Sequence, residues 1–144
     1  MKLICVLAAA LALAGCSSAA RSACEKAKEC CSTMSRCEEV NRDGPNWEER
    51  CEIDLNSEMQ TLGTFDHEAC SAVASKYSVL LDCLGGISCS DISQELLHHG
   101  HVAKCDPEYQ ELCLAKRSSG DACGHDWGKL GCDGAEATLW IGHW

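Results

Sequence analysis

Three histidines in the sequence HHGH, His98, His99 and His101, are spaced closely enough to share a metal ion. Imidazole nitrogen is a common ligand of Zn²⁺ and Cu²⁺, and Cys105 and Asp106 follow as further donors. The same histidines would also suit the C-terminal end of a polar helix, whose dipole favours positive charge. We expect this second role, with no bound metal and no cofactor, and His98, His99 and His101 remain candidates for a metal-binding alternative.

A second pair of titratable residues, His125 and Asp126, lies in the sequence CGHDWG. No Gly-x-Ser-x-Gly segment accompanies it, so the sequence contains no recognisable activated serine. Neighbouring acids such as Glu38 and Glu39 would not converge on one substrate atom, because adjacent helix positions point in different directions. We predict no catalytic residue and no enzyme activity, and a hydrolase of unknown type ranks third among the functions considered.

Cysteine is unusually frequent in this chain, with fourteen among 144 residues. The sequence contains no Cys-x-x-Cys, the spacing used by zinc ribbons, thioredoxin-like redox sites and c-type haem attachment. Disulfide bonding is the remaining common role, and disulfides form in oxidising compartments. The cysteine count therefore predicts an exported, disulfide-bonded protein.

The first sixteen residues support export. Lys2 is followed by an apolar run that has the length of a signal sequence and is too short to span a membrane. The tetrapeptide Leu13-Ala14-Gly15-Cys16 resembles the lipobox of bacterial lipoproteins. This resemblance implies cleavage before Cys16, a diacylglyceryl group on its thiol and acylation of the new amine. Such acyl chains would hold the protein on a membrane. In the lipoprotein family an aspartate directly after the cysteine favours retention at the inner membrane, and Ser17 stands there in this chain, so the resemblance implies the outer membrane of the cell envelope.

Twelve cysteines would then remain, because Cys5 leaves with the signal and Cys16 carries lipid. An even number in an exported chain predicts a framework of six disulfides. The connectivity stays open, since twelve cysteines allow on the order of ten thousand pairings. The candidate half-cystines are Cys24, Cys30, Cys31, Cys37, Cys51, Cys70, Cys83, Cys89, Cys105, Cys113, Cys123 and Cys132.

The mature chain would be acidic, because removal of Lys2 changes its formal net charge from −10 to −11. Nucleic acid is excluded as a partner, since the sequence has no basic patch. We expect the membrane as a partner through the lipid anchor, together with an unidentified protein or small-molecule ligand. Aromatic residues make up only 5% of the chain, so the core is thin and disulfides are expected to contribute much of the stability.

Most of the cysteines fall on helices predicted from the spacing of apolar residues. Ser22-Ala23-Cys24-Glu25 has the form of a capping box and predicts a helix from residue 22 to about Val40. The spacing from Trp47 to Leu62 predicts a second helix that begins near Asn46 and ends at Gly63. Three more helices are expected, one between an Asp66 N-cap and Gly85-Gly86, one from Ser88 or Ser90 to about His98, and one from Asp106-Pro107 to 117.

The disulfides should join neighbouring helices rather than close surface loops, because the cysteines lie on apolar stripes or at helix ends. Cys30 and Cys31 point about 100° apart on a helix, so they should bond two different neighbours. Cys123 and Cys132 flank the segment GHDWGKLG and could pair with each other.

The fold class predicted is all-α, a small disulfide-stapled bundle of about five helices with an irregular C-terminal extension. The expected segments are a signal peptide (1–15), a tether (16–21), a cysteine-rich helical domain (22–117) and the extension (118–144). In the extension, Trp127, Trp140 and Trp144 either dock on the helical domain, which we favour, or form an exposed binding patch.

The segment YSVLLDCLGGISCSDI (77–92) resembles part of the cysteine-rich helical lipoproteins of myxobacteria and related deltaproteobacteria. The matching positions are Cys70, Tyr77, Cys83, Leu84, Ser88 and Cys89, and with the flanking cysteines the resemblance covers about residues 24–113. It implies a helical, disulfide-stapled, lipid-anchored protein and no particular activity. The doubled Cys30-Cys31 and the Trp-rich tail depart from the family pattern. We therefore expect a non-catalytic structural or binding protein of the cell envelope.

Overall fold

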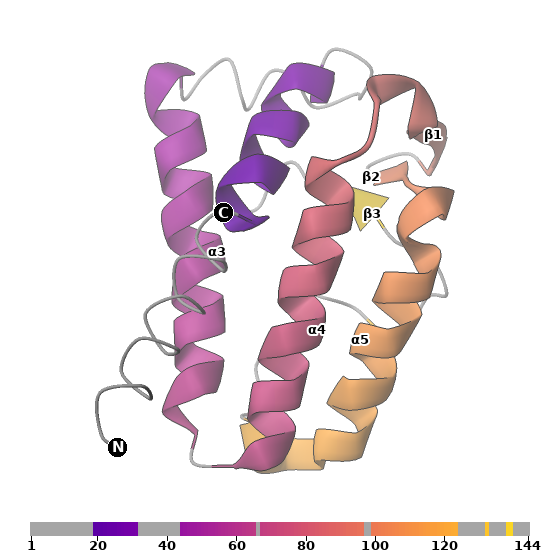
Figure 1. Cartoon of the computed structure of the whole chain (residues 1–144). Coiled ribbons are helices and arrows are strands. Elements are labelled where there is room, and N and C mark those ends of the chain that lie inside the picture. The colour runs from indigo at the N-terminus through magenta and orange to yellow at the C-terminus, as the bar shows by residue number, and fades with distance from the viewer. Residues whose placement is uncertain are drawn as a thin grey trace, which may run out of the picture.

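Four α-helices make up most of the described chain. The computed structural model describes residues 19–31, 44–65, 67–96, 99–123, 132 and 138–139. The helices are residues 19–30, α3 (Trp47–Thr64), α4 (Glu68–Gly85) and α5 (Asp106–Ser119). They lie side by side, and successive helices run in opposite directions (Figure 1). The predicted all-α class is confirmed.

The apolar stripes predicted from the sequence form the core. Trp47, Cys51, Leu55, Met59 and Leu62 are the buried residues of α3, as their spacing indicated. The corresponding stripe of α4 is buried as well and consists of Cys70, Val73, Tyr77, Leu80, Leu81 and Leu84. The stripe residues of α5, Tyr109, Leu112 and Cys113, complete the set. None of the helices in the described parts of the chain combines the length and apolar character needed to cross a bilayer.

The 19–30 helix corrects two predictions. It already includes residues 19–21, which were expected to belong to a tether, and both Ala19 and Ala20 are fully buried. Ser22 and Glu25 therefore lie inside the helix and form no capping box. Glu25 instead accepts a hydrogen bond from Arg21 Nε at 3.0 Å.

The boundaries of α4 differ slightly from those predicted. His67, rather than Asp66, is the N-cap, because its Nδ1 accepts a hydrogen bond from the N–H of Ala69 at 3.2 Å. Asp66 lies outside the described residues. The predicted end at Gly85-Gly86 is confirmed, and the N–H of Gly86 donates to the carbonyl oxygens of Asp82 and Cys83.

The α5 helix begins one position earlier than an N-cap at Asp106 would require. Cys105 is its N-cap, and Asp106 and Pro107 lie in its first turn. A proline is tolerated there because the first helical N–H groups have no partner within the helix. The helix extends to Ser119, and the 3-10 helix η5 (Gly120–Cys123) follows, so helical structure continues into the segment expected to be irregular.

The prediction of a short helix that ends near His98 is wrong for most of that segment. Ser88 does precede a helical turn, the 3-10 helix η3 (Cys89–Asp91), but the chain then forms β1 (Ser93–Leu96) and β2 (His99–His101). β1 and β2 are antiparallel, and β2 also pairs antiparallel with β3 (Thr138–Leu139). The order β1-β2-β3 joins distant parts of the chain, which a helical pattern within residues 88–98 could not reveal.

Candidate functional site

Disulfides are the chemical feature that the structure describes most fully. Eleven of the twelve candidate half-cystines are disulfide-bonded, and the twelfth, Cys37, lies outside the described residues. For five bridges the structure describes both cysteines, and their Cα–Cα distances lie between 5.0 and 6.0 Å. The pairs are Cys24–Cys51, Cys30–Cys89, Cys70–Cys123, Cys83–Cys105 and Cys113–Cys132.

The pattern of these bridges confirms part of the prediction and corrects the rest. Cys30 bonds Cys89, so the neighbouring Cys31, which is also bonded, has a different partner, as expected. The pairing of Cys123 with Cys132 is wrong, because Cys123 bonds to α4 and Cys132 to α5. Only Cys24–Cys51, among the five, joins two α-helices. The others attach a 3-10 turn or residue 132 to a helix.

Two of the bridges hold both ends of the segment 89–105, which contains β1 and β2. Cys89, at the start, bonds to Cys30 of the 19–30 helix, and Cys105, at the end, bonds to Cys83 of α4. Ile92 and Val102 are buried just inside these ends, with 8% and 0% of their surface exposed. The segment is therefore attached to the helices by covalent bonds and by apolar contacts at each end.

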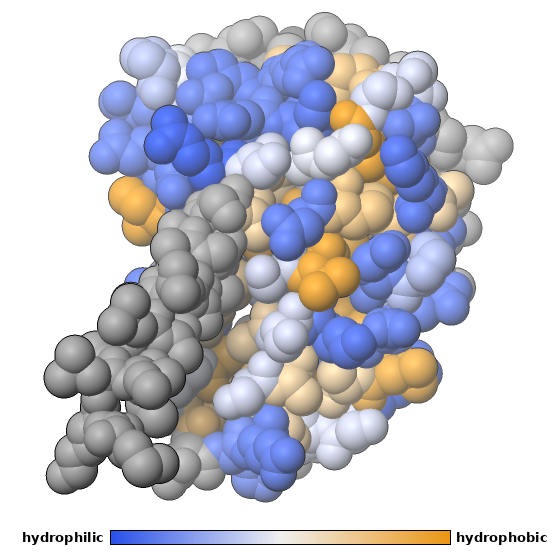
Figure 2. Space-filling model, viewed as in Figure 1, coloured by the Kyte–Doolittle hydropathy of each residue, from blue (hydrophilic) through white to orange (hydrophobic). Residues whose placement is uncertain are grey.

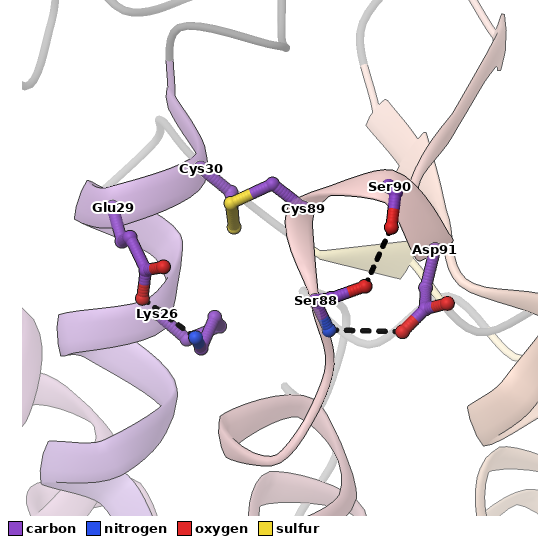
Figure 3. Close-up of polar contacts among 7 residues, drawn as sticks. All are labelled: Lys26, Glu29, Cys30, Ser88, Cys89, Ser90 and Asp91. Carbon is purple, nitrogen blue, oxygen red and sulfur yellow. Dashed lines mark hydrogen bonds and ion pairs between the residues drawn. A yellow bond between two sulfur atoms is a disulfide. The ribbon is translucent and has the colours of Figure 1, made fainter.

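Polar contacts stabilise the turn at the start of this segment (Figure 3). The N–H of Ser88 donates to Asp91 Oδ2 at 2.9 Å, and the hydroxyls of Ser88 and Ser90 are 2.7 Å apart. The hydrogen bonds from Ser88 lower the pKa of Asp91, with a smaller contribution from the positive charge of Lys104. Across the Cys30–Cys89 bridge, Lys26 of the 19–30 helix forms an ion pair with Glu29 at 2.6 Å.

Two of the three clustered histidines, His99 and His101, lie in the sheet and not at a helix end. His99 and His101 belong to β2, where His99 pairs with Leu96, and His101 pairs with both Ser93 and Thr138. His98 lies outside the described residues. Over the described residues, no group of three or more His, Cys, Asp or Glu is arranged to hold a metal ion. The metal-binding role of the cluster stays a prediction.

A hydrogen bond between the buried Tyr77 of α4 and the half-buried Glu58 of α3 joins these two helices. The hydroxyl of Tyr77 donates to Glu58 Oε2 at 2.9 Å, and Tyr77 is only 2% exposed. Burial raises the pKa of Tyr77 well above its ordinary value, and the charge of Glu58 and the hydrogen bond to it raise the pKa further. A protonated phenol that donates to a carboxylate is a stable structural contact.

The visible surface is mostly polar, with small apolar areas separated from one another (Figure 2). Among the described residues, the large apolar side chains left exposed are Ile53, Val79 and Leu114, one on each of α3, α4 and α5. Single apolar residues of this kind are common on protein surfaces. They do not define a binding site.

The remaining residues named from the sequence lie outside the described residues. They are the lipobox residue Cys16, the pair His125 and Asp126, and the tryptophans Trp127, Trp140 and Trp144. Comparisons of this chain with protein-family models, with curated proteins and with solved structures found no match. The function is therefore argued from the chain itself.

Proposed function

We propose that this protein is a non-catalytic structural or binding protein of the cell envelope, held on a membrane by lipid attached to Cys16. The observation that carries the proposal is the oxidation state of its cysteines. All eleven described half-cystines are disulfide-bonded, and such a framework forms and persists only in an oxidising compartment. The apolar N-terminal run and the sequence Leu13-Ala14-Gly15-Cys16 supply the route to that compartment.

The arrangement of the bridges supports a structural or binding role over catalysis. Most of the placed bridges attach turns to helices, and the hydrogen bond from Tyr77 to Glu58 joins two helices. These features restrict the motion of the backbone. A restricted backbone suits a stable structural domain, or one that presents a constant surface to a partner.

Intact mass spectrometry without reduction tests this proposal. The protein purified from membranes of its bacterial host should begin at Cys16, carry acyl groups, and contain no alkylatable thiol. In a Cys16→Ser variant the acyl mass should be lost and the chain should leave the membrane fraction. Cys5→Ala is the matched control, because Cys5 lies in the segment to be removed, and that variant should remain acylated. Unacylated protein in the cytosol with reactive thiols would contradict the proposal.

Metal binding by His98, His99 and His101 is the second candidate. The observation in its favour is that β2 pairs on both sides and that its segment is bridged to the helices at both ends, which would hold two of the three histidines at fixed backbone positions. Zinc should raise the melting temperature of the oxidised protein, and the double variant His99→Ala/His101→Ala should abolish that rise. An equal rise in the variant would place the metal elsewhere, and no rise in either protein would exclude this candidate.

A further inference from the structure

The chain between the proposed lipid and the folded domain is very short. The predicted tether ended at residue 21, but the helix already includes residue 19. Only Ser17 and Ser18 separate Cys16 from that helix. A fully extended chain spans at most about 3.6 Å per residue, so the Cα atoms of Cys16 and Ala19 can be no more than about 11 Å apart.

The first turn of the 19–30 helix is fixed to the rest of the domain. A Cβ atom on Gly85 would lie 2.8 Å from the Cβ of Ser22 and 3.1 Å from its carbonyl carbon, so the two backbones are in close contact. Two residues later, Cys24 is bonded to Cys51 of α3. The start of this helix therefore cannot swing away from α3 and α4 unless the bundle opens.

The residues around this end define an anchor-proximal face. It consists of the first turn of the 19–30 helix, Gly85 and Gly86 at the end of α4, and Glu48 and Glu52 of α3. The α3 residues belong to it because they adjoin Cys51, which is bonded to Cys24 of the 19–30 helix, and because Glu48 forms an ion pair with Lys28 of that helix. In Figure 1 the indigo start of the helix lies beside α3 and α4.

We infer that the anchor-proximal face lies directly against the lipid headgroups, with the domain held at the bilayer surface by the shortness of its link. This inference rests on the proposed lipidation of Cys16. Acyl chains on Cys16 place its backbone at the headgroup level, and three extended residues then reach residue 19. The three residues from Ala19 to Ser22 add about 4.5 Å of helix. Ser22 and the end of α4 are thus within about 15 Å of the lipid attachment.

Charge attraction does not explain this contact. The anchor-proximal face carries Arg21 together with the acidic residues Glu25, Glu48 and Glu52; Arg21 pairs with Glu25 at 3.0 Å and Glu48 with Lys28 at 3.1 Å. A face with this balance of charges would not be drawn to anionic lipid. The contact should therefore persist in zwitterionic lipid and at high salt, since a covalent link is not screened.

Paramagnetic broadening of amide NMR signals measures this contact. The acylated, disulfide-bonded protein is placed in phosphatidylcholine nanodiscs that contain a lipid with a gadolinium chelate on its headgroup. Signals from residues 20–25 and 84–86 should be lost, whereas those near Thr64 and His67 should persist. Gly85 and Glu68 are 17 residues apart on α4, which corresponds to about 25 Å.

A variant with twelve Gly and Ser residues inserted between Ser18 and Ala19 is the matched control. A flexible linker of that length adds a root-mean-square distance of about 19 Å, so the selective loss of signals should disappear. Uniform broadening in the natural chain would overturn the inference, and so would selective loss that survives the insertion, because the link would then not set the contact. The intact mass is measured on the same sample. If acyl groups are missing, the proposed function itself fails and the inference fails with it, whereas acylated protein with uniform broadening refutes the inference alone.

Discussion

At the scale of single residues, two helices come into close contact at a position that has no side chain, Gly85. Gly85 allows the end of α4 to approach the backbone of Ser22. Gly63 in α3, by contrast, would have nothing within 4 Å of an added Cβ. Both glycines are helical, so intrinsic helix propensity acts on them in the same direction.

Substitution of Gly85 by alanine should therefore destabilise the protein despite the higher helix propensity of alanine. We expect a loss of about 1–3 kcal/mol in the free energy of unfolding, measured by urea denaturation of the oxidised protein, because Ser22 must move to make room. Gly63→Ala is the control and should stabilise the protein by about 0.5–1 kcal/mol. Equal effects at the two sites would show that the helices are not in close contact at Gly85.

Tyr77 should make stability depend on alkaline pH. Its pKa is raised in the folded protein by burial and by Glu58, so the folded state holds the phenolic proton more tightly than the unfolded state does. The stability from this group is complete below the unfolded pKa of about 10 and falls as the pH rises above that value, by at most about 1.4 kcal/mol per pH unit. Urea denaturation between pH 8 and pH 11 measures the fall.

The Tyr77→Phe variant, which lacks the phenolic proton, is the control for this dependence of stability on alkaline pH. At pH 8 the variant should lose about 1 kcal/mol, because the half-buried carboxylate of Glu58 loses a donor at 2.9 Å. Above pH 10 its stability should fall less steeply than that of the natural protein. Parallel pH profiles for the two proteins would mean that Tyr77 is not the group responsible.

At the scale of elements, the spacing of apolar residues correctly predicted which side chains of α3 and α4 are buried, but it predicted the ends of the helices less accurately. The stripe from Trp47 to Leu62 is buried as predicted, because the period of an α-helix decides which side chains share a face. The ends depend on which nearby group reaches an unpaired N–H. The imidazole of His67 does so for α4, a role that the usual preference for Asp assigned to Asp66.

His67→Ala should therefore cost about 1 kcal/mol in the free energy of unfolding, since the N–H of Ala69 loses its acceptor. His67→Ser and His67→Asp should recover most of the loss, because both side chains can accept the same hydrogen bond. Thermal unfolding of the oxidised proteins, followed by circular dichroism, makes the comparison. If serine and aspartate are as destabilising as alanine, the histidine contributes by packing and not as a cap.

The segment after Ser88 shows why its strands were missed. Ile92, Leu96 and Leu97 have a spacing that fits a short helix, which is the local preference. β2 instead pairs with β1 on one side and with β3, more than thirty residues away, on the other. Pairing with a distant strand satisfies backbone groups that a local pattern does not take into account.

At the scale of the whole molecule, disulfides are the main constraint on the unfolded chain. The five placed bridges have sequence separations between 19 and 59 residues. Closing a loop of that length is worth about 3–4 kcal/mol for an isolated bridge, and nested bridges contribute less than their sum. A domain of this size has a total stability of about 5–15 kcal/mol, so the bridges together are comparable to all of it.

Complete reduction should consequently unfold the domain without denaturant. In dithiothreitol at neutral pH and 25 °C, we expect loss of most of the helical circular dichroism signal and of any cooperative melting transition. The oxidised protein in the same buffer is the control. A reduced protein that still melts cooperatively would show that the apolar core is sufficient to maintain the fold.

The sequence alone determined the helical class, the buried stripes and the role of the cysteines, because each follows from local periodicity or from residue counts. Only the tertiary structure decided which cysteines pair, that His99 and His101 lie in a strand, and that the first helix begins as early as residue 19. These depend on which segments meet in space, and twelve cysteines are compatible with far too many pairings for spacing to select one. The close contact of Ser22 with Gly85 also depends on tertiary structure, because the sequence does not show that Ser22 occupies the space beside this glycine.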